Sequence, residues 1–302
     1  MTRTTVRGAG GGGLERSCAI RRPDWVESRA LADGVEVLRA WFAGRGFDPH
    51  RHDTYAIGLT DDGVQAFDYR GATRTSTPGQ VVVLHPDETH DGRAGTPDGF
   101  GYRIVYVAPA RVHEAARAIC GRPCALPFLR EPVTANARLA FAITSAFGVE
   151  PEPLAADGLV LGLAEALVDA DPSAGRAAAP TALDRRALSR ARAFLDAETS
   201  RVVRSAELET VTGLTRYDLA RQFRAAFGTS PYRYSLLRRL DRARSELGRN
   251  RPLADVALGA GFADQAHLSR MFKSAYGVAP ARYRALASRR PLERGVPAAS
   301  PR

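Results

Sequence analysis

The sequence contains little cysteine. Its three cysteines, Cys18, Cys120 and Cys124, are too few for a disulfide-stabilised fold of 302 residues. Cys120 and Cys124 lie one helical turn apart, and no second pair completes a four-ligand zinc site. We therefore expect structural or incidental thiols in a reducing compartment, the cytoplasm.

Long apolar runs are also missing. No run reaches the roughly 18 to 20 residues that a membrane-spanning helix needs, so we expect no membrane partner. The first residues, MTRTTVRGAGGGGLERS, are basic and glycine-rich and lack the apolar centre of a secretory signal. The sequence therefore predicts a flexible leader at 1–22.

Acidic residues are scarce in the last third of the chain. Residues 183–290 contain 22 Lys plus Arg and 10 Asp plus Glu, a net charge of +12, whereas the rest of the chain carries −2. Such a segment is either a solvated basic surface or a partner for a polyanion, most often nucleic acid. Charge alone does not decide between these two interpretations.

Strand and turn signals dominate residues 47–108. The segments YAIGLT and VQAFDYR flank Asp61, Asp62 and Gly63, and this Asp-Gly pair favours a hairpin. VVVLH at 81–85 and FGYRIVYVAP at 100–109 are further predicted strands. Several short strands closed by Gly, Pro and Asp turns predict an antiparallel sandwich or a small barrel.

The pattern becomes helical after residue 109. Apolar residues recur every three or four positions in ARVHEAARAI, PVTANARLAFAITSAFG and PLAADGLVLGLAEALVDA. These helices either cover the β domain or pair with a second copy of the chain. The small, Pro- and Gly-containing stretch that follows predicts a linker at 170–182.

One motif occurs twice in the basic last third of the chain. LARQFRAAFGTSP at 219–231 recurs as LSRMFKSAYGVAP at 268–280, an offset of 49. Apolar residues spaced four apart fill one helix face in each copy, Gly228 or Gly277 ends the helix, and a proline follows three residues later. A shorter helix and a glycine turn precede each copy, at 205–213 and 253–261. Two helix-turn-helix units are therefore predicted.

Capping and spacing support this interpretation. Thr215 and Asp218 form a predicted capping box, and Asp264 can cap the second copy. Between the copies, YRYSLLRRLDRARSELG predicts a helix with Arg238, Arg239 and other arginines turned away from its apolar side. About 18 residues give about 27 Å of helix. A rigid helix of this length can hold the second helices of the two units, the reading helices, about one DNA turn of 34 Å apart.

Residues 183–288 resemble the DNA-binding domain of the AraC/XylS family of bacterial transcription regulators. The resemblance is carried by GLTRYDLARQFRAAFGTSPYRY and AGFADQAHLSRMFKSAYGVAPARYR, and it includes a turn one residue longer in the second copy. It implies two helix-turn-helix units joined by a helix, each placing its second helix in the major groove of double-stranded DNA.

Outward positions on these two helices are the candidate DNA contacts. Arginine binding guanine is the commonest specific contact, which favours Arg221 and Arg270 as base readers, although Arg221 could instead pair with Asp218. By analogy with the family, Tyr217 and Ala220 also face bases. The full set of candidates is Arg216, Tyr217, Ala220, Arg221, Arg224, Gln265, Ala266, His267, Ser269, Arg270 and Lys273.

The N-terminal half contains most of the histidines. HDTYAIGLTDDGVQAFDYRG and TPGQVVVLHPDETHDG resemble the cupin-like effector domain of AraC-type regulators, which implies a pocket for a small molecule. Metal-binding cupins follow His-x-His with a glutamate, whereas Ala56 and Ile57 stand here, so we predict no metal and no cofactor. The candidate effector-binding residues are His50, His52, Tyr55, Tyr69, His90 and Tyr102; each could equally be structural.

These features predict an α+β chain of two domains. A cupin-like β-barrel with following helices occupies 23–169, and an all-α double helix-turn-helix domain occupies 183–290, before a disordered tail at 291–302. The predicted function is effector-controlled, sequence-specific transcription regulation by a homodimer that contacts RNA polymerase, without catalytic residues or enzyme activity.

Three alternatives compete with this prediction. The first is a cupin-type metal enzyme with an attached DNA-binding domain, which the missing glutamate disfavours. The second is a DNA-repair methyl acceptor. Such a protein needs a four-cysteine zinc site, and this sequence has only three cysteines. The third is a non-specific nucleic-acid coat protein, whose affinity would depend on salt and little on sequence.

Overall fold

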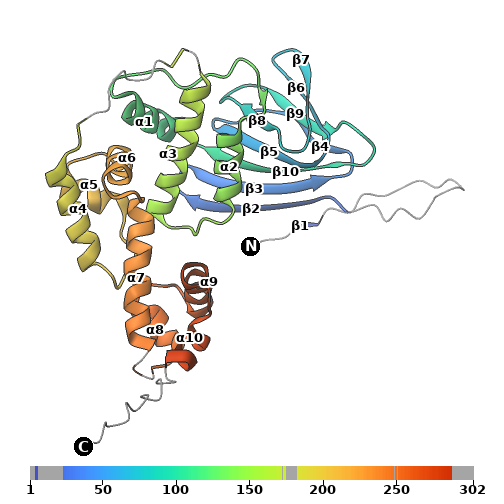
Figure 1. Cartoon of the computed structure of the whole chain (residues 1–302). Coiled ribbons are helices and arrows are strands. Elements are labelled where there is room, and N and C mark those ends of the chain that lie inside the picture. The colour runs from blue at the N-terminus through green and yellow to red at the C-terminus, as the bar shows by residue number, and fades with distance from the viewer. Residues whose placement is uncertain are drawn as a thin grey trace, which may run out of the picture.

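A computed structural model describes residues 4–5, 23–171, 173–174, 182–247, 249 and 251–287. Nearly all of the predicted leader at 1–22, most of the linker at 170–182 and the whole tail at 291–302 lie outside the described residues. The predicted limits of the five segments therefore stay predictions. The fold class is α+β, as predicted: a sheet-rich N-terminal part is followed by helices alone (Figure 1).

The N-terminal part contains two antiparallel sheets (Figure 1). In spatial order, the larger sheet contains β1 (Thr4–Thr5), β2 (Trp25–Ala32), β3 (Val35–Phe42), β10 (Phe100–Val107), β5 (Tyr55–Gly63), β8 (Val81–Leu84) and β11 (Val133–Thr134). The smaller sheet contains β4 (Arg45–His50), β9 (His90–Ala94), β6 (Gln65–Tyr69) and β7 (Ala72–Ser76).

Alternation along the strands supplies two apolar layers. In β10, Phe100, Tyr102 and Ile104 belong to a core with residues of the smaller sheet. Val105 and Val107, whose side chains point to the other face of β10, belong to a second core that is shared with the helices. Successive side chains of a strand point to opposite faces, so one strand contributes to both layers.

The predicted hairpin at Asp61-Asp62-Gly63 is wrong. β5 pairs with β10 and β8, whereas the following β6 pairs with β7 and β9 in the other sheet. Gly63 has a φ of +64°, and a Cβ there would lie 2.0 Å from the Gly99 carbonyl oxygen. The Asp-Gly turn therefore passes the chain between sheets, at a close backbone approach that only glycine allows.

Three helices cover the larger sheet: α1 (Pro109–Cys120), α2 (Ala137–Ala146) and α3 (Pro153–Ala170). They lie where the sequence predicts helices. α3 contacts α1, α2 and β2, and it also contacts the later helices α5, α6 and α7. Its residues are therefore buried on most sides, which explains why its sequence is apolar nearly all round.

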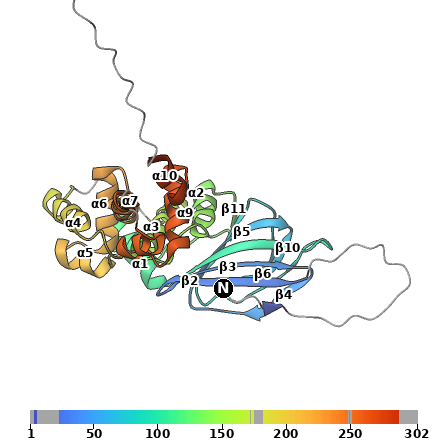
Figure 2. The same ribbon diagram turned by 90° about the horizontal axis from the view of Figure 1, so that it is seen from below.

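In the part of the chain that the structure describes, seven helices follow, and their two apolar cores both include residues of the longest one. They are α4 (Arg185–Ala197), α5 (Ser205–Thr212), α6 (Arg216–Phe227), α7 (Pro231–Leu247), α8 (Leu253–Gly259), α9 (Gln265–Tyr276) and α10 (Pro280–Ala287). Seen from below, the first three of these helices lie on one side of the longest one and the last two on the other (Figure 2). α5 and α6 form the first predicted helix-turn-helix unit, α8 and α9 the second, and α7 is the connecting helix. No helix of the described chain has the length and apolar character needed to cross a membrane.

Candidate nucleic-acid interface and its cover

The predicted caps position both second helices. The Thr215 hydroxyl accepts a hydrogen bond from the Asp218 N–H (3.3 Å) at the start of α6, and the Asp264 carboxylate accepts one from the His267 N–H (2.7 Å) at the start of α9. Each helix ends at a glycine in the left-handed conformation, Gly228 or Gly277. Local sequence therefore fixes where the two candidate reading helices begin and end.

The first reading helix is covered by the N-terminal part. Tyr217 is 0 % exposed and Ala220 is 5 % exposed, and both belong to the apolar core between the larger sheet and α1–α3. Arg111 Nε donates a hydrogen bond to the Tyr217 hydroxyl (3.0 Å), and burial raises the pKa of Tyr217 to about 12. The prediction that these two side chains point outward is wrong for this arrangement. Their role in reading bases stays a prediction.

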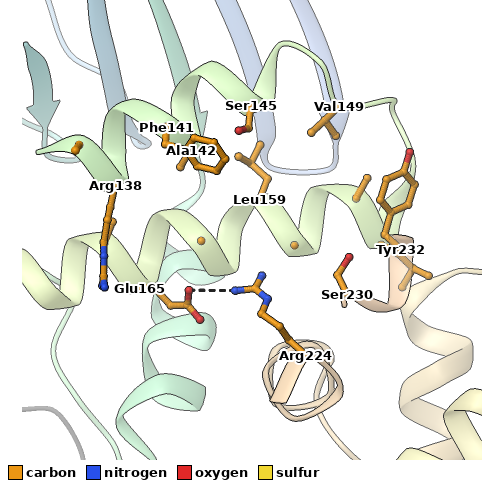
Figure 3. A pocket seen from close by; sticks show the side chains of 16 residues that line it. Arg138, Phe141, Ala142, Ser145, Val149, Leu159, Glu165, Arg224, Ser230 and Tyr232 are labelled. Carbon is orange, nitrogen blue, oxygen red and sulfur yellow. Dashed lines mark hydrogen bonds and ion pairs between the residues drawn. The ribbon is translucent and has the colours of Figure 1, made fainter. Parts of the chain in front are cut away.

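The arginines of α6 are paired. Arg224 Nη1 lies 3.3 Å from Glu165 Oε2 of α3, an ion pair drawn in Figure 3. Arg216 pairs with Glu209 (3.1 Å) and lies 3.9 Å from Asp157 of α3. Arg221 lies 3.6 Å from Asp218, which is the alternative partner that the sequence suggested. Opening the two parts would free Arg224 from its carboxylate on α3.

The second reading helix is more open. Gln265, Ala266 and Lys273 are exposed, and Ser269 is half-buried. Arg270 is exposed and its guanidinium lies 3.2 Å from Glu150, in the loop before α3. His267 is buried rather than outward-facing, and burial lowers its pKa.

Sequence reasoning missed the buried ion pair of the connecting helix. Arg239 is 1 % exposed, and its Nη1 donates to both carboxylate oxygens of Glu152, each at 2.9 Å. The guanidinium also donates to the carbonyls of Ala260 and Gly261 and lies over the Phe262 ring. The prediction that Arg239 faces outward is wrong, because Arg239 lies on the buried side of α7, next to Leu236 and Leu240, where Glu152 and Phe262 cover it.

A row of carboxylates in residues 150–165 therefore faces the basic helices. Glu150, Glu152, Asp157 and Glu165 pair with, or lie near, Arg270, Arg239, Arg216 and Arg224 respectively. Asp157 also accepts hydrogen bonds from Arg111 and Ser205, and its burial raises its pKa. Carboxylate oxygens bind guanidinium groups as phosphate oxygens do, so in this arrangement the four arginines have anionic partners within the protein.

A mostly apolar cavity of about 770 Å³ lies at this boundary (Figure 3). Phe141 of α2 and Leu159 of α3 line it from one side, and Arg224 and Tyr232 line it from the C-terminal helices. Gly158 and Gly162 of α3 also line the cavity, and a Cβ at either position would meet no atom within 4 Å. Its size lies within the range of small-molecule sites.

The six predicted effector residues do not form one site. The Tyr55 hydroxyl donates to the Pro127 carbonyl (2.9 Å) in the core beneath the helices. Tyr69 and Tyr102 lie in the core between the sheets, where the Tyr69 hydroxyl bonds His85. The three histidines gather where β4 meets β9 in the smaller sheet, and His90 lies opposite Tyr69 of β6.

Those three histidines converge. One ring nitrogen each of His50, His52 and His90 lies within 4.8 Å of those of the other two. Burial lowers the pKa of His52 and lowers that of His90 to about 4. Their spacing of two predicts His50 and His52 on one strand face, but β4 ends at His50 and His52 lies beyond it, and no local signal predicts that His90 joins them. The three nitrogens lie close enough together for these side chains to hold a metal ion, although the glutamate of metal-binding cupins is absent.

Two family models match this chain in separate places. The model described as an AraC-like ligand binding domain matches residues 34–159, and the model described as a helix-turn-helix domain matches residues 208–286. This chain is an AraC-type transcription regulator. Its N-terminal part is the effector-binding domain and its C-terminal helices are the DNA-binding domain.

Relatives of this AraC-type regulator include an uncharacterized HTH-type transcriptional regulator, YbfI, of Bacillus subtilis (strain 168). It is 26 % identical over 243 residues, covering 78 % of this chain and 86 % of the relative. Among solved structures, apo ToxT of Vibrio cholerae strain SCE256 is 15 % identical, with a TM-score of 0.38, covering 83 % of this chain and 97 % of that one. An AraC-type regulator from Chromobacterium violaceum is 25 % identical, with a TM-score of 0.33, covering 35 % of this chain and 96 % of that one.

Proposed function

We propose that the described arrangement is a closed state of the regulator, in which the effector domain (23–169) covers the first reading helix of the DNA-binding domain (183–290). The observation that carries this proposal is the burial of Tyr217 and Ala220 beneath α1 and α3, on the helix face predicted to read bases. A duplex and α3 cannot occupy that face together. Binding with both units therefore requires the domains to separate.

The effector controls the equilibrium between the closed and open states. A ligand shifts such an equilibrium only by its difference in affinity for the two states. The cavity between α2, α3 and the C-terminal helices meets this requirement directly, because Arg224 and Tyr232 leave it when the domains separate. We therefore place a small, mostly apolar effector there, as an alternative to the predicted site among His50, His52, Tyr55, Tyr69, His90 and Tyr102.

In the open state, the predicted residues of α6 and α9 contact DNA. Arg221 and Arg270 read bases, while Arg216, Arg224 and Lys273 bind phosphates. The regulator acts in the cytoplasm as a homodimer that contacts RNA polymerase and catalyses no reaction. Phe141, 75 % exposed on α2, supports a dimer contact on this helix.

A gel-shift titration of full-length protein tests the closed state, on a site selected from a random DNA pool. Glu165→Lys places a positive charge against Arg224 and should open the domains, raising specific affinity roughly fivefold, the factor that about 1 kcal/mol produces. Asp98→Lys is the matched control, because it makes the same charge change on an exposed loop between β9 and β10. Equal affinities of the two variants would contradict the proposal, since added charge alone would then explain any gain.

A further inference from the structure

The start of α3 lies between the two helix-turn-helix units and contacts both. Leu154 belongs to the apolar core of the first unit, together with residues of α4, α5 and α6. Two residues earlier, the Glu152 carboxylate accepts hydrogen bonds from Arg239 of α7, the helix whose leucines lie in the core of the second unit. One short segment of the effector domain is therefore fixed to both units.

The connecting helix α7 packs mainly with the second unit. Its leucines all lie in the core shared with α8 and α9, whereas only Tyr232 and Tyr234, at its start, reach the core of the first unit. Residues 228–230 are the short link between the end of α6 and the start of α7. The angle between the two units therefore depends on this link and on the contacts made around it.

Arg239 connects the contact with Glu152 to the turn of the second unit. Its guanidinium donates hydrogen bonds to the carbonyls of Ala260 and Gly261, which lie between α8 and α9. The same turn approaches the first unit closely, because a Cβ at Gly261 would lie 2.7 Å from the Cα of Arg201, in the loop between α4 and α5. The effector domain and both units therefore meet at one junction.

The ion pair at this junction is buried on both sides. The side chains of Arg239 and Glu152 are 1 % and 9 % exposed, whereas Arg270, in the neighbouring pair with Glu150, is 58 % exposed. Removing one partner of a buried ion pair leaves the other charge uncompensated, which is far more costly than the loss of an exposed pair. The position of α7 against the start of α3 therefore depends strongly on the Glu152 carboxylate.

We propose that Glu152 is a positioning residue of the regulator: through Arg239 it sets the angle between the two helix-turn-helix units in the closed state. This inference rests on the proposed closed state and goes beyond it, because it concerns the second unit. Separation of the domains takes the carboxylate away from Arg239 and frees the second unit to turn about residues 228–230. The effector domain thereby controls the arrangement of the two reading helices as well as access to the first one.

Distances between spin labels in the free, full-length protein test this role. One pair of labels, on Ala193→Cys of α4 and Ser274→Cys of α9, reports the distance between the two units, and both positions are exposed. A separate pair, on Arg117→Cys of α1 and Ala226→Cys of α6, reports the closure of the effector domain on the first unit. Both pairs are placed in protein whose native cysteines are replaced by serine.

Glu152→Gln removes the charge and keeps the length of the side chain. It should shift the distance between the units to a broader distribution, while the closure distance stays short. Glu131→Gln is the matched control, because it removes the same charge from an exposed pair with Arg74 inside the effector domain and should change neither distance. Glu152→Asp repeats the test if Glu152→Gln does not fold, since it keeps the charge and withdraws it from Arg239.

The two label pairs separate this inference from the closed state on which it rests. The positioning role of Glu152 is overturned, and the closed state is not, if the distance between the units is as narrowly distributed in Glu152→Gln as in Glu131→Gln. It is also overturned if that distance changes only together with the closure distance. A long closure distance in the wild type would overturn the closed state, and the role of Glu152 with it.

Discussion

At an offset of 49 residues, Tyr217 of the first reading helix corresponds to Ala266 of the second, and only Tyr217 is buried. Arg224 and Lys273 correspond to each other and are both exposed, and Arg224 pairs with Glu165 of the effector domain. The inward faces of the two helices are alike, because each completes the core of its own unit. The outward faces differ because only α6 meets the effector domain over its length. The repeat thus encodes two similar units, and the domain boundary makes them unequal.

The largest expected effect comes from the residue that distinguishes the two units. Tyr217→Ala removes an aromatic ring from the boundary core and should lower the free energy of unfolding of the full chain by about 3 kcal/mol. The corresponding change, Ala266→Ser, alters an exposed position and should stay within about 0.5 kcal/mol. Urea denaturation of both variants measures the difference. Similar losses of unfolding free energy in the two variants would contradict the claim that the domain boundary makes the two units unequal.

The next effect concerns DNA affinity. Arg221→Ala and Arg270→Ala should each cost about 1–3 kcal/mol on the selected site, roughly 5- to 150-fold in affinity. Both losses are expected because opening exposes the first helix before DNA binds. If only Arg270→Ala weakens binding in a gel-shift titration, the effector domain still covers α6 in the complex with DNA. If neither does, the assignment of these arginines to base reading is wrong.

The smallest effect is a pH dependence confined to the second unit. Burial lowers the pKa of His267, outweighing Glu150 and Glu152, which raise it; Arg239 and Arg270 lower it further. The unfolded chain then binds more protons as the pH falls below about 6.5, so His267 costs the folded state stability toward acid.

The variant His267→Gln isolates this contribution, because other buried histidines titrate equally in both proteins. The wild type should lose stability relative to His267→Gln as the pH falls from 7.5 to 5, by at most about 1 kcal/mol. Thermal melting across this range measures the gap. A gap that widens in favour of the wild type would show that Glu150 dominates instead.

Local signals predicted the repeat well. Thr215, Asp264 and the glycines after α6 and α9 decide where those helices begin and end through contacts within a few residues. The burial of Tyr217 and the pairing of Arg239 with Glu152 depend on residues about 90 to 106 positions away, for which helical periodicity carries no signal. The hairpin predicted from Asp62-Gly63 is wrong for a related reason. An Asp-Gly pair favours a turn of the chain, but it does not specify which sheet the next strand joins.

The histidine group also combines a feature that local sequence predicts with one that depends on distant residues. Alternation predicts His50 and His52 on one strand face, whereas β4 ends at His50 and only the short separation along the chain keeps His52 beside it. His90 reaches them through the register of β9 against β4, and that register becomes visible only when both sheets are assembled. The predicted absence of a metal rested on Ala56 and Ile57, which stand where metal-binding cupins have a glutamate, and it stays a prediction.

The most direct test of the covered first helix is a distance measurement between domains. Spin labels on Arg117→Cys of α1 and Ala226→Cys of α6, both exposed positions, report their separation once the native cysteines are replaced by serine. The account predicts one short distance in the free protein and a clearly longer one when the selected DNA is bound. An unchanged distance in a saturated specific complex would contradict it.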